Sequence, residues 1–167
     1  MSEGAVALIL ERSDIAKSRG VHSLAELAGV SVTNDAGEMA FPAKDGRGLS
    51  LAMSQCLADA EQTSLAPDVI LSGSSGTDVD DKLEGHAVNA LFNTPPPLAT
   101  SKRNIGVAMG TAIFFDIALA IEILKKKAIP KSMLPFDHSV TNISSIMCNG
   151  IGLNGLYGSV LLRTSHG

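Results

Sequence analysis

Short apolar runs alternate with amphipathic helical patterns along this chain, and this alternation restricts the folds that the sequence can adopt. The clearest helical pattern lies between about Gly48 and Gln62, where apolar residues recur every three or four positions. Pro67 interrupts the chain after it, and Val69–Leu71 is typical of a short buried strand. Strands alternating with helices predict an α/β fold with a layered sheet. The length of 167 residues predicts a single domain over residues 1–167.

Two further apolar runs predict elements in the interior of the fold. Ala5–Glu11 (AVALILE) is almost continuously apolar, which predicts a strand buried on both faces. Gly106–Lys127 predicts a central buried helix, with Gly106 and Gly110 permitting close backbone contact. Further strands are expected over Ser23–Thr33, Leu98–Ser101, Ile143–Met147 and Leu156–Arg163, helices over Arg12–Arg19 and Asp78–Phe92, and a loop over Asn34–Gly46.

Charge and cysteine usage exclude several classes of function. The net charge is −4 and the longest basic run is Lys125–Lys127, so a nucleic-acid surface is not expected. Cys56 and Cys148 are far apart and lack CxxC spacing, which predicts no metal site, no cofactor and a reducing cytoplasmic location. Gly110–Leu124 is too short for a membrane span and two acidic residues interrupt it, so no membrane partner is expected.

Three glycine-rich segments stand where predicted strands end. They are Ile70–Glu84 (ILSGSSGTDVDDKLE), Thr100–Gly110 (TSKRNIGVAMG) and Asn149–Leu161 (NGIGLNGLYGSVL). The first contains Ser72–Thr77, a strand-to-helix turn that has the shape of an anion cradle. The acidic residues that follow it would repel phosphate, and the turn matches neither a phosphate-binding loop nor a nucleophile elbow, so a plain turn is favoured.

In order and spacing, the three segments resemble the active-site segments in the C-terminal half of β-ketoacyl synthases, the thiolase-fold condensing enzymes of fatty-acid and polyketide assembly. The family patterns read I-x-x-H-G-T-S-T-x-x-x-D-K-x-E, K-x-x-x-G-H-x-x-G and N-S-F-G-F-G-G-x-N. The N-terminal residues Glu3–Glu11 also resemble the family's G-E-G-A-x-x-L-V-L-E strand. The resemblance implies a thiolase-like layered fold, represented by its C-terminal half with a mixed sheet and a buried central helix.

Both catalytic histidines of the family pattern are missing. The alignment puts Gly73 at the first histidine and Val107 at the second, and neither side chain can transfer a proton or donate a hydrogen bond. The pattern positions that this chain retains are Asp81, Glu84, Lys102, Asn149, Gly152 and Gly155. The two phenylalanines of the third segment are replaced by Ile151 and Leu153, and its second glycine by Asn154. The resemblance therefore implies no catalytic residue in this chain.

The degenerate pattern is similar to that of chain-length factors and other pseudo-ketosynthases. It implies a non-catalytic ketosynthase subunit or fragment that pairs with an active β-ketoacyl-ACP synthase and is inactive alone. The family's nucleophilic cysteine lies in the other half, which we expect to be supplied separately or to lie outside a fragment. The implied partners are a ketosynthase or nucleophile-half polypeptide and, through the complex, acyl carrier protein, in a hetero- or homo-oligomer.

Two alternatives remain open at this point. A divergent active condensing or acyltransferase subunit would use Lys102 or Asn149 for polarisation, and a substitution at Lys102 would then abolish activity. A free-standing interaction domain unrelated to acyl chemistry would be a compact monomer.

Overall fold

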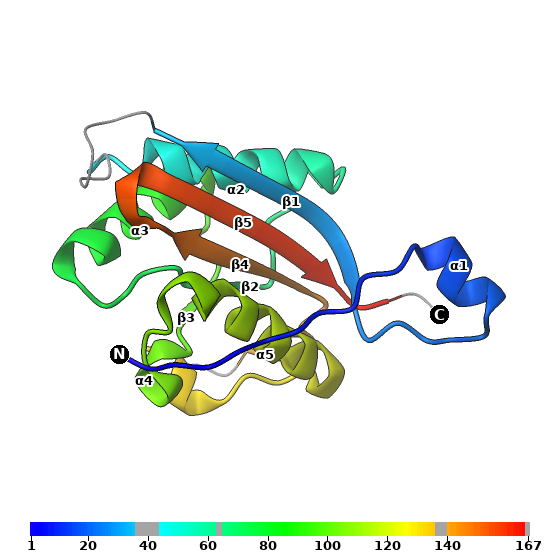
Figure 1. Cartoon of the computed structure of the whole chain (residues 1–167). Coiled ribbons are helices and arrows are strands. Elements are labelled where there is room, and N and C mark those ends of the chain that lie inside the picture. Colours follow the sequence, from blue (N-terminus) through cyan, green and yellow to red (C-terminus); the bar gives the residue numbers. More distant parts are fainter. Residues whose placement is uncertain (36–43, 63–64, 136–139, 166–167) are drawn as a thin grey trace.

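A mixed five-stranded sheet forms the framework of the molecule (Figure 1). The computed structural model describes residues 1–35, 44–62, 65–135 and 140–165. The strand order is β1-β5-β4-β2-β3, with bounds Glu26–Asn34 (β1), Val69–Leu71 (β2), Leu98–Ala99 (β3), Ser145–Ile151 (β4) and Leu156–Arg163 (β5). β1, β5 and β4 pair antiparallel, whereas β2 pairs parallel with both β4 and β3. The predicted mixed sheet is therefore confirmed.

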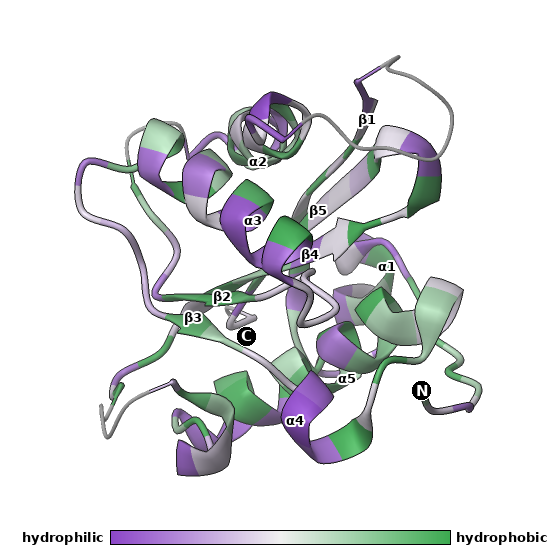
Figure 2. Ribbon diagram, turned by 90° about the vertical axis from the view of Figure 1, so that its left-hand side faces the viewer, coloured by the Kyte–Doolittle hydropathy of each residue, from purple (hydrophilic) through white to green (hydrophobic). Residues whose placement is uncertain are grey.

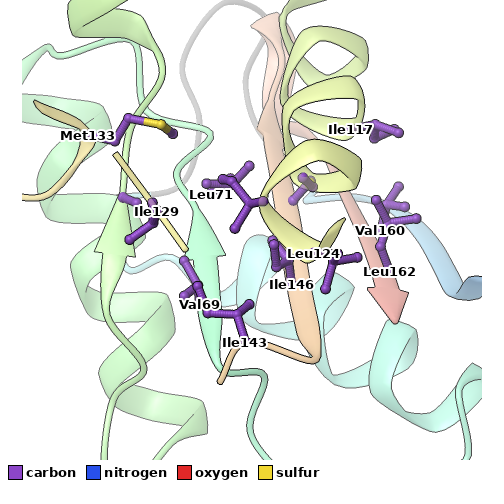
Figure 3. Close-up of a cluster of buried hydrophobic side chains, with 14 of the residues drawn as sticks. Val69, Leu71, Ile117, Leu124, Ile129, Met133, Ile143, Ile146, Val160 and Leu162 are labelled. Atoms are coloured by element: carbon purple, nitrogen blue, oxygen red, sulfur yellow. The ribbon is translucent and has the colours of Figure 1, made fainter. Parts of the chain in front are cut away.

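Helices cover both faces of this sheet (Figure 2). Their bounds are Ser13–Ser18 (α1), Arg47–Asp59 (α2), Asp78–Leu91 (α3), Lys102–Ile105 (α4) and Ala112–Lys126 (α5). Neighbouring residues of β2 point to opposite layers: Val69 and Leu71 pack with α5, whereas Ile70 packs with α2 and α3. Figure 3 shows the α5 layer, in which Ile146 of β4 and Leu124 of α5 lie together. Burial on both faces explains why β2 and the first part of β4 are apolar without alternation.

The prediction of a strand over Ala5–Glu11 is wrong. These residues run outside the sheet as an extended segment across α5, and they belong to no strand (Figure 1). Ile9 and Leu10 are 96% and 72% exposed, whereas Val6 and Leu8 are half-buried. An apolar run can be a buried strand only where neighbouring strands pair with its edges, and the described part of the chain places none beside it.

The predicted long helix begins six residues later than expected, at Ala112 instead of Gly106. Lys102–Ile105 forms a separate short helix, and Gly106 ends it with a φ of 76° that a continuous right-handed helix cannot contain. The expected close contact at Gly110 is also wrong, since a Cβ placed there meets nothing within 4 Å. Only one side of α5 is buried: Ile123 is inside the core, whereas Phe114 is 43% exposed.

The other elements lie near their predicted positions. β5 has the predicted bounds, and α3 ends one residue earlier than predicted. α2 begins one residue earlier and ends three residues earlier than expected. β4 begins two residues later than predicted and continues to Ile151, because Asn149 and Gly150 pair with Ser159 and Gly158 of β5. Most of the expected loop Asn34–Gly46 lies outside the described residues. Within the described ranges, no helix combines the length and the apolar character needed to cross a membrane.

Asp68 joins the start of β2 to the start of β4. Its Oδ2 atom accepts hydrogen bonds from the backbone N and Oγ of Ser144 at 2.8 and 2.9 Å. It also accepts from the backbone N and Oγ of Ser145 at 2.9 and 3.1 Å. Partial burial alone would raise the pKa of Asp68, but these hydrogen bonds favour the ionised carboxylate and lower the pKa below its ordinary value.

We expect Asp68→Asn to lower the free energy of unfolding by about 1 kcal/mol at pH 7, since these are partly exposed hydrogen bonds to a charged group. The lowered pKa means that Asp68 stabilises the fold above its ordinary pKa of about 3.9, and that this contribution is lost as the pH falls through the folded-state value. Urea unfolding at pH 7 and pH 3 checks this. A difference between wild type and variant that does not shrink at pH 3 would contradict it.

Candidate functional site

The three glycine-rich segments meet at the carboxyl end of the parallel strands. Ser72 follows β2, and its backbone N donates to Ala99 O of β3 at 2.8 Å. Gly73 lies against β4, because a Cβ built on it would be 3.0 Å from the carbonyl carbon and oxygen of Asn149. Lys102 follows β3 and begins α4. The structure therefore places the segments identified by sequence around one point.

Glu84 of α3 is the centre of this arrangement and is only 2% exposed. Its carboxylate accepts hydrogen bonds from Gly73 N at 3.1 Å, Ser74 N at 3.3 Å and Asn149 Nδ2 at 3.0 Å. Ser72 Oγ also donates to it. A buried carboxylate with four donors is fully engaged, so Glu84 holds the turn after β2 in place and is not free to act as a base.

Asn149 is engaged in the same way. It is 1% exposed, its Oδ1 accepts from Ser159 Oγ at 2.9 Å, and its Nδ2 lies 3.4 Å from Met53 Sδ in addition to its bond to Glu84. The amide side chain thus ties β4 to β5, α2 and α3. It has no remaining donor aimed at an open site.

The serine-rich turn is closed by acidic residues of α3. Asp81 accepts from Ser74 Oγ, and Asp80 accepts from Ser75 Oγ and from Ser75 N at 3.3 Å. Thr77 caps α3, since its Oγ1 accepts from Asp80 N at 3.2 Å. Asp80 thus binds the backbone N–H of Ser75, and Glu84 binds those of Gly73 and Ser74, which an anion cradle would need. The arrangement agrees with a plain structural turn.

Lys102 forms a buried ion pair that sequence reasoning did not identify. Its Nζ lies 2.6 Å from Asp116 Oδ2, and the two side chains are 9% and 1% exposed. Nζ also donates to Ser72 O, and Ser101 Oγ donates to Asp116 Oδ1 at 2.5 Å. The ammonium group is neutralised and occupied, so it is not available to polarise a substrate. The signal in the sequence was an acidic residue inside an apolar helical run, which requires a partner.

The two cysteines are not activated nucleophiles. Burial, followed by the charge of Asp116, raises the pKa of the Cys148 thiol well above its ordinary value, although Lys102 opposes this. Burial likewise raises the pKa of Cys56 to about 12. Both side chains are buried and unpaired with one another. They behave as neutral core residues at neutral pH.

Neither degenerate position offers a group for proton transfer. Gly73 has no side chain, and the Val107 side chain is apolar. The Val107 backbone oxygen accepts from Ser2 N at 2.9 Å. His86 Nδ1 lies 3.2 Å from Lys44 O in an exposed part of α3. Among the described residues, no group of histidine, cysteine and acidic side chains has the arrangement of a metal site.

The glycines of the third segment have different roles. Gly155 has a φ of +68°, and a Cβ there would lie 1.9 Å from Asp35 Oδ1, so the position requires glycine. Asp35 also accepts from Tyr157 Oη at 2.9 Å. Gly152 has a φ of −95°, and its N donates to Leu156 O at 2.7 Å. Leu153, at a position where the family has phenylalanine, is 77% exposed.

The amino-acid sequence of this chain is similar to one protein family and to individual members of it. Residues 24–134 match the family described as "Beta-ketoacyl synthase, C-terminal domain". The chain is 30% identical over 135 residues to 3-oxoacyl-[acyl-carrier-protein] synthase 2 of Mycobacterium tuberculosis, with 78% of this chain and 32% of that protein covered. It is 23% identical over 180 residues to the same-named synthase of Vibrio harveyi, covering 98% of this chain and 43% of that protein. The chain thus spans about a third to two fifths of these relatives.

Solved structures share the fold. A type II PKS acyl-carrier protein in complex with its ketosynthase bound to the hexaketide matches with a TM-score of 0.83 at 22% identity, covering 93% of this chain and 42% of that one. The ishigamide ketosynthase/chain length factor matches with a TM-score of 0.83 at 21% identity, covering 92% and 41%. These likenesses show the thiolase-like α/β fold.

Proposed function

This chain belongs to the β-ketoacyl synthase family, and we propose that it serves there as a non-catalytic component that pairs with an active β-ketoacyl-ACP synthase in fatty-acid or polyketide assembly. The observation that carries the proposal is that the site lacks the family's histidines and that its remaining polar side chains are already paired. Gly73 and Val107 stand where the family pattern has histidines, while Glu84 binds Asn149 and the backbone of Gly73, and Lys102 is paired with Asp116.

The chemistry of condensation explains why these losses are decisive. Loss of carbon dioxide from a malonyl thioester leaves negative charge on the thioester oxygen, and a catalyst must direct hydrogen-bond donors at that oxygen. Gly73 and Val107 have no side-chain donor, and the donors of Lys102 and Asn149 point at Asp116 and Glu84. The retained residues therefore preserve the shape of the loops without their acid-base function.

A partner synthase is proposed on three grounds. The chain covers 42% of the chain that it matches in a solved ketosynthase complex, so more than half of that chain lies outside the match. One structural neighbour is itself a ketosynthase/chain length factor. The composition is 45% hydrophobic and 18% charged, which favours a large interface. Acyl carrier protein would then meet this chain only through the complex, in a cytoplasmic hetero- or homo-oligomer, with residues 1–167 acting as one domain.

The two alternatives have less support. A divergent active site built on Lys102 conflicts with its ion pair to Asp116. A free-standing domain unrelated to acyl chemistry conflicts with the family match over residues 24–134.

We expect that Gly73→His combined with Val107→His will not produce decarboxylation of malonyl-acyl carrier protein by this chain. The new imidazoles would lack supporting hydrogen bonds, and a side chain at Gly73 must displace the backbone of Asn149. Carbon dioxide release is the measurement, with Val107→His alone as the variant that leaves the crowded position untouched. Release above the wild-type level by either variant would contradict the proposal.

A further inference from the structure

We propose that Arg163 and the cavity beside it form a binding site for a small carboxylate. The cavity has a volume of about 290 Å³ and lies where α2 ends, β4 begins and β5 ends. Asp68, which lines it, precedes β2, whereas Ser72 and Gly73 of the candidate site follow β2. The cavity is thus separate from the candidate site, and a negative result here would leave the proposed function unchanged.

Arg163 carries a positive charge that has no acidic partner. It is the last residue of β5, it is half-buried, and none of the ion pairs in the described part of the chain includes it. Its Nη2 donates to Ala60 O at the end of α2, while its Nε is buried without an acceptor among the described residues. A cation removed from water needs an anion or hydrogen-bond acceptors, so the fold leaves this guanidinium incompletely satisfied.

The other polar side chains around the cavity are bound to one another. The hydroxyl groups of Ser144 and Ser145 donate to Asp68 Oδ2 at 2.9 and 3.1 Å. Gln62 Nε2 donates to Leu65 O at 3.2 Å. Arg163 therefore supplies the positive charge of the cavity and the N–H donors that remain for a ligand.

The charge balance of the cavity favours a singly charged ligand. Asp68 is ionised at neutral pH because its hydrogen bonds to Ser144 and Ser145 lower its pKa. One negative charge thus already lies near the single positive charge of Arg163, and it would repel a phosphate dianion more strongly than a carboxylate. The two oxygens of a carboxylate also match two neighbouring N–H groups of a guanidinium.

The size and walls of the cavity limit the ligand to a short chain. A volume of about 290 Å³ is at the lower end of the range of roughly 300–1,000 Å³ that is usual for ligand pockets. Leu65 and Ala66 add apolar surface to the wall, and both residues are exposed. A carboxylate with a few carbon atoms, such as butyrate, suits both properties.

A purely structural role for Arg163 is the alternative that the test must separate. A positive charge at the C-terminal end of α2 is favourable for the helix dipole, and the bond to Ala60 O fits that role. Capping of α2 explains the position of Nη2. It does not explain why Nε is buried without an acceptor beside a cavity.

Titration of the full chain with sodium butyrate, at an ionic strength held constant with sodium chloride, tests the proposal. NMR follows the backbone amides of Ser144, Arg163 and Thr164. We expect saturable shifts at these amides with a dissociation constant of about 1–10 mM, as suits so small a ligand. Sodium phosphate is the second probe, and we expect it to bind at least about tenfold more weakly.

Three variants separate binding from capping. Arg163→Gln removes the cation but keeps a side-chain donor for Ala60 O, and we expect the dissociation constant for butyrate to rise at least about tenfold. Arg163→Lys keeps the charge without the paired N–H groups, so binding should weaken by a smaller factor. Asp68→Asn removes the competing negative charge, and binding should tighten about threefold or more.

Weaker binding by Arg163→Gln together with tighter binding by Asp68→Asn supports the site. If Arg163→Gln does not fold, weaker binding by Arg163→Lys takes its place. The absence of saturable shifts with butyrate, or an unchanged dissociation constant in the folded Arg163 variants, overturns the site and leaves Arg163 as a cap of α2. Tighter binding of phosphate than of butyrate overturns the assignment to a carboxylate, and so does an Asp68→Asn variant that binds butyrate no more tightly than the wild type.

Discussion

Replacement of Lys102 by methionine will lower the free energy of unfolding by about 3–5 kcal/mol, because it leaves the buried carboxylate of Asp116 without its cation. Methionine retains much of the aliphatic volume, so loss of packing is a small part of the effect. Asp116 is fully buried and would retain only the hydrogen bond from Ser101. Chemical denaturation at pH 7 measures the difference.

The double variant Lys102→Met, Asp116→Leu is the matched control. It removes both charges and should recover most of the lost stability, since a buried ion pair contributes little compared with an apolar pair of similar volume. A single variant that unfolds like the wild type would contradict the buried pair. A double variant less stable than Lys102→Met would show that the two residues do not act together.

Replacement of Glu84 by alanine is expected to cost about 3 kcal/mol or more. The substitution leaves the N–H groups of Gly73 and Ser74 and the amide of Asn149 without their acceptor in a buried place. Glu84→Gln retains one acceptor oxygen, so we expect a smaller loss. Urea unfolding gives the stabilities, and amide exchange at residues 73–75 should accelerate most in the alanine variant.

Equal losses for the alanine and glutamine variants would contradict the hydrogen-bond explanation and indicate that charge alone matters. A further control is Asp80→Asn, whose partner Ser75 is exposed. It should change the stability by less than about 1 kcal/mol. A large loss there would mean that the whole turn, and not Glu84, fixes the loop.

Strands and helices were predicted correctly where the residues of one segment are enough to define the element. β2 lies at Val69–Leu71 as expected, because an apolar run bounded by Pro67 and a glycine turn has one interpretation. The helix start at Ala112 was missed, since the apolar pattern of one segment does not show that Gly106 has a φ of 76° and lies beside Ser2. The error over Ala5–Glu11 has the same origin. A buried strand is defined by its neighbours, and a single run cannot show whether they are present.

Some features of the candidate site could likewise be predicted from the sequence, and others required the fold. The assignment of Gly73 and Val107 to the two histidine positions stays a prediction from motif spacing, and the structure places both segments at the same end of the sheet. Asp116 was noted only as an interruption of an apolar run, and its pairing with Lys102 required the fold. Asp35, which makes glycine necessary at position 155, could not be found from the motif because it belongs to another part of the chain.

Decarboxylation of malonyl-acyl carrier protein by the assembled complex tests the non-catalytic role most directly. One complex would contain this chain as the Lys102→Met, Asp116→Leu double variant with an intact partner synthase, and the other would contain the wild-type chain with the partner's catalytic cysteine and histidines replaced. If this chain is non-catalytic, the first complex retains the wild-type rate and the second has none. Loss of activity in the first complex while it remains assembled, or carbon dioxide release by the second, would show that this chain performs chemistry of its own.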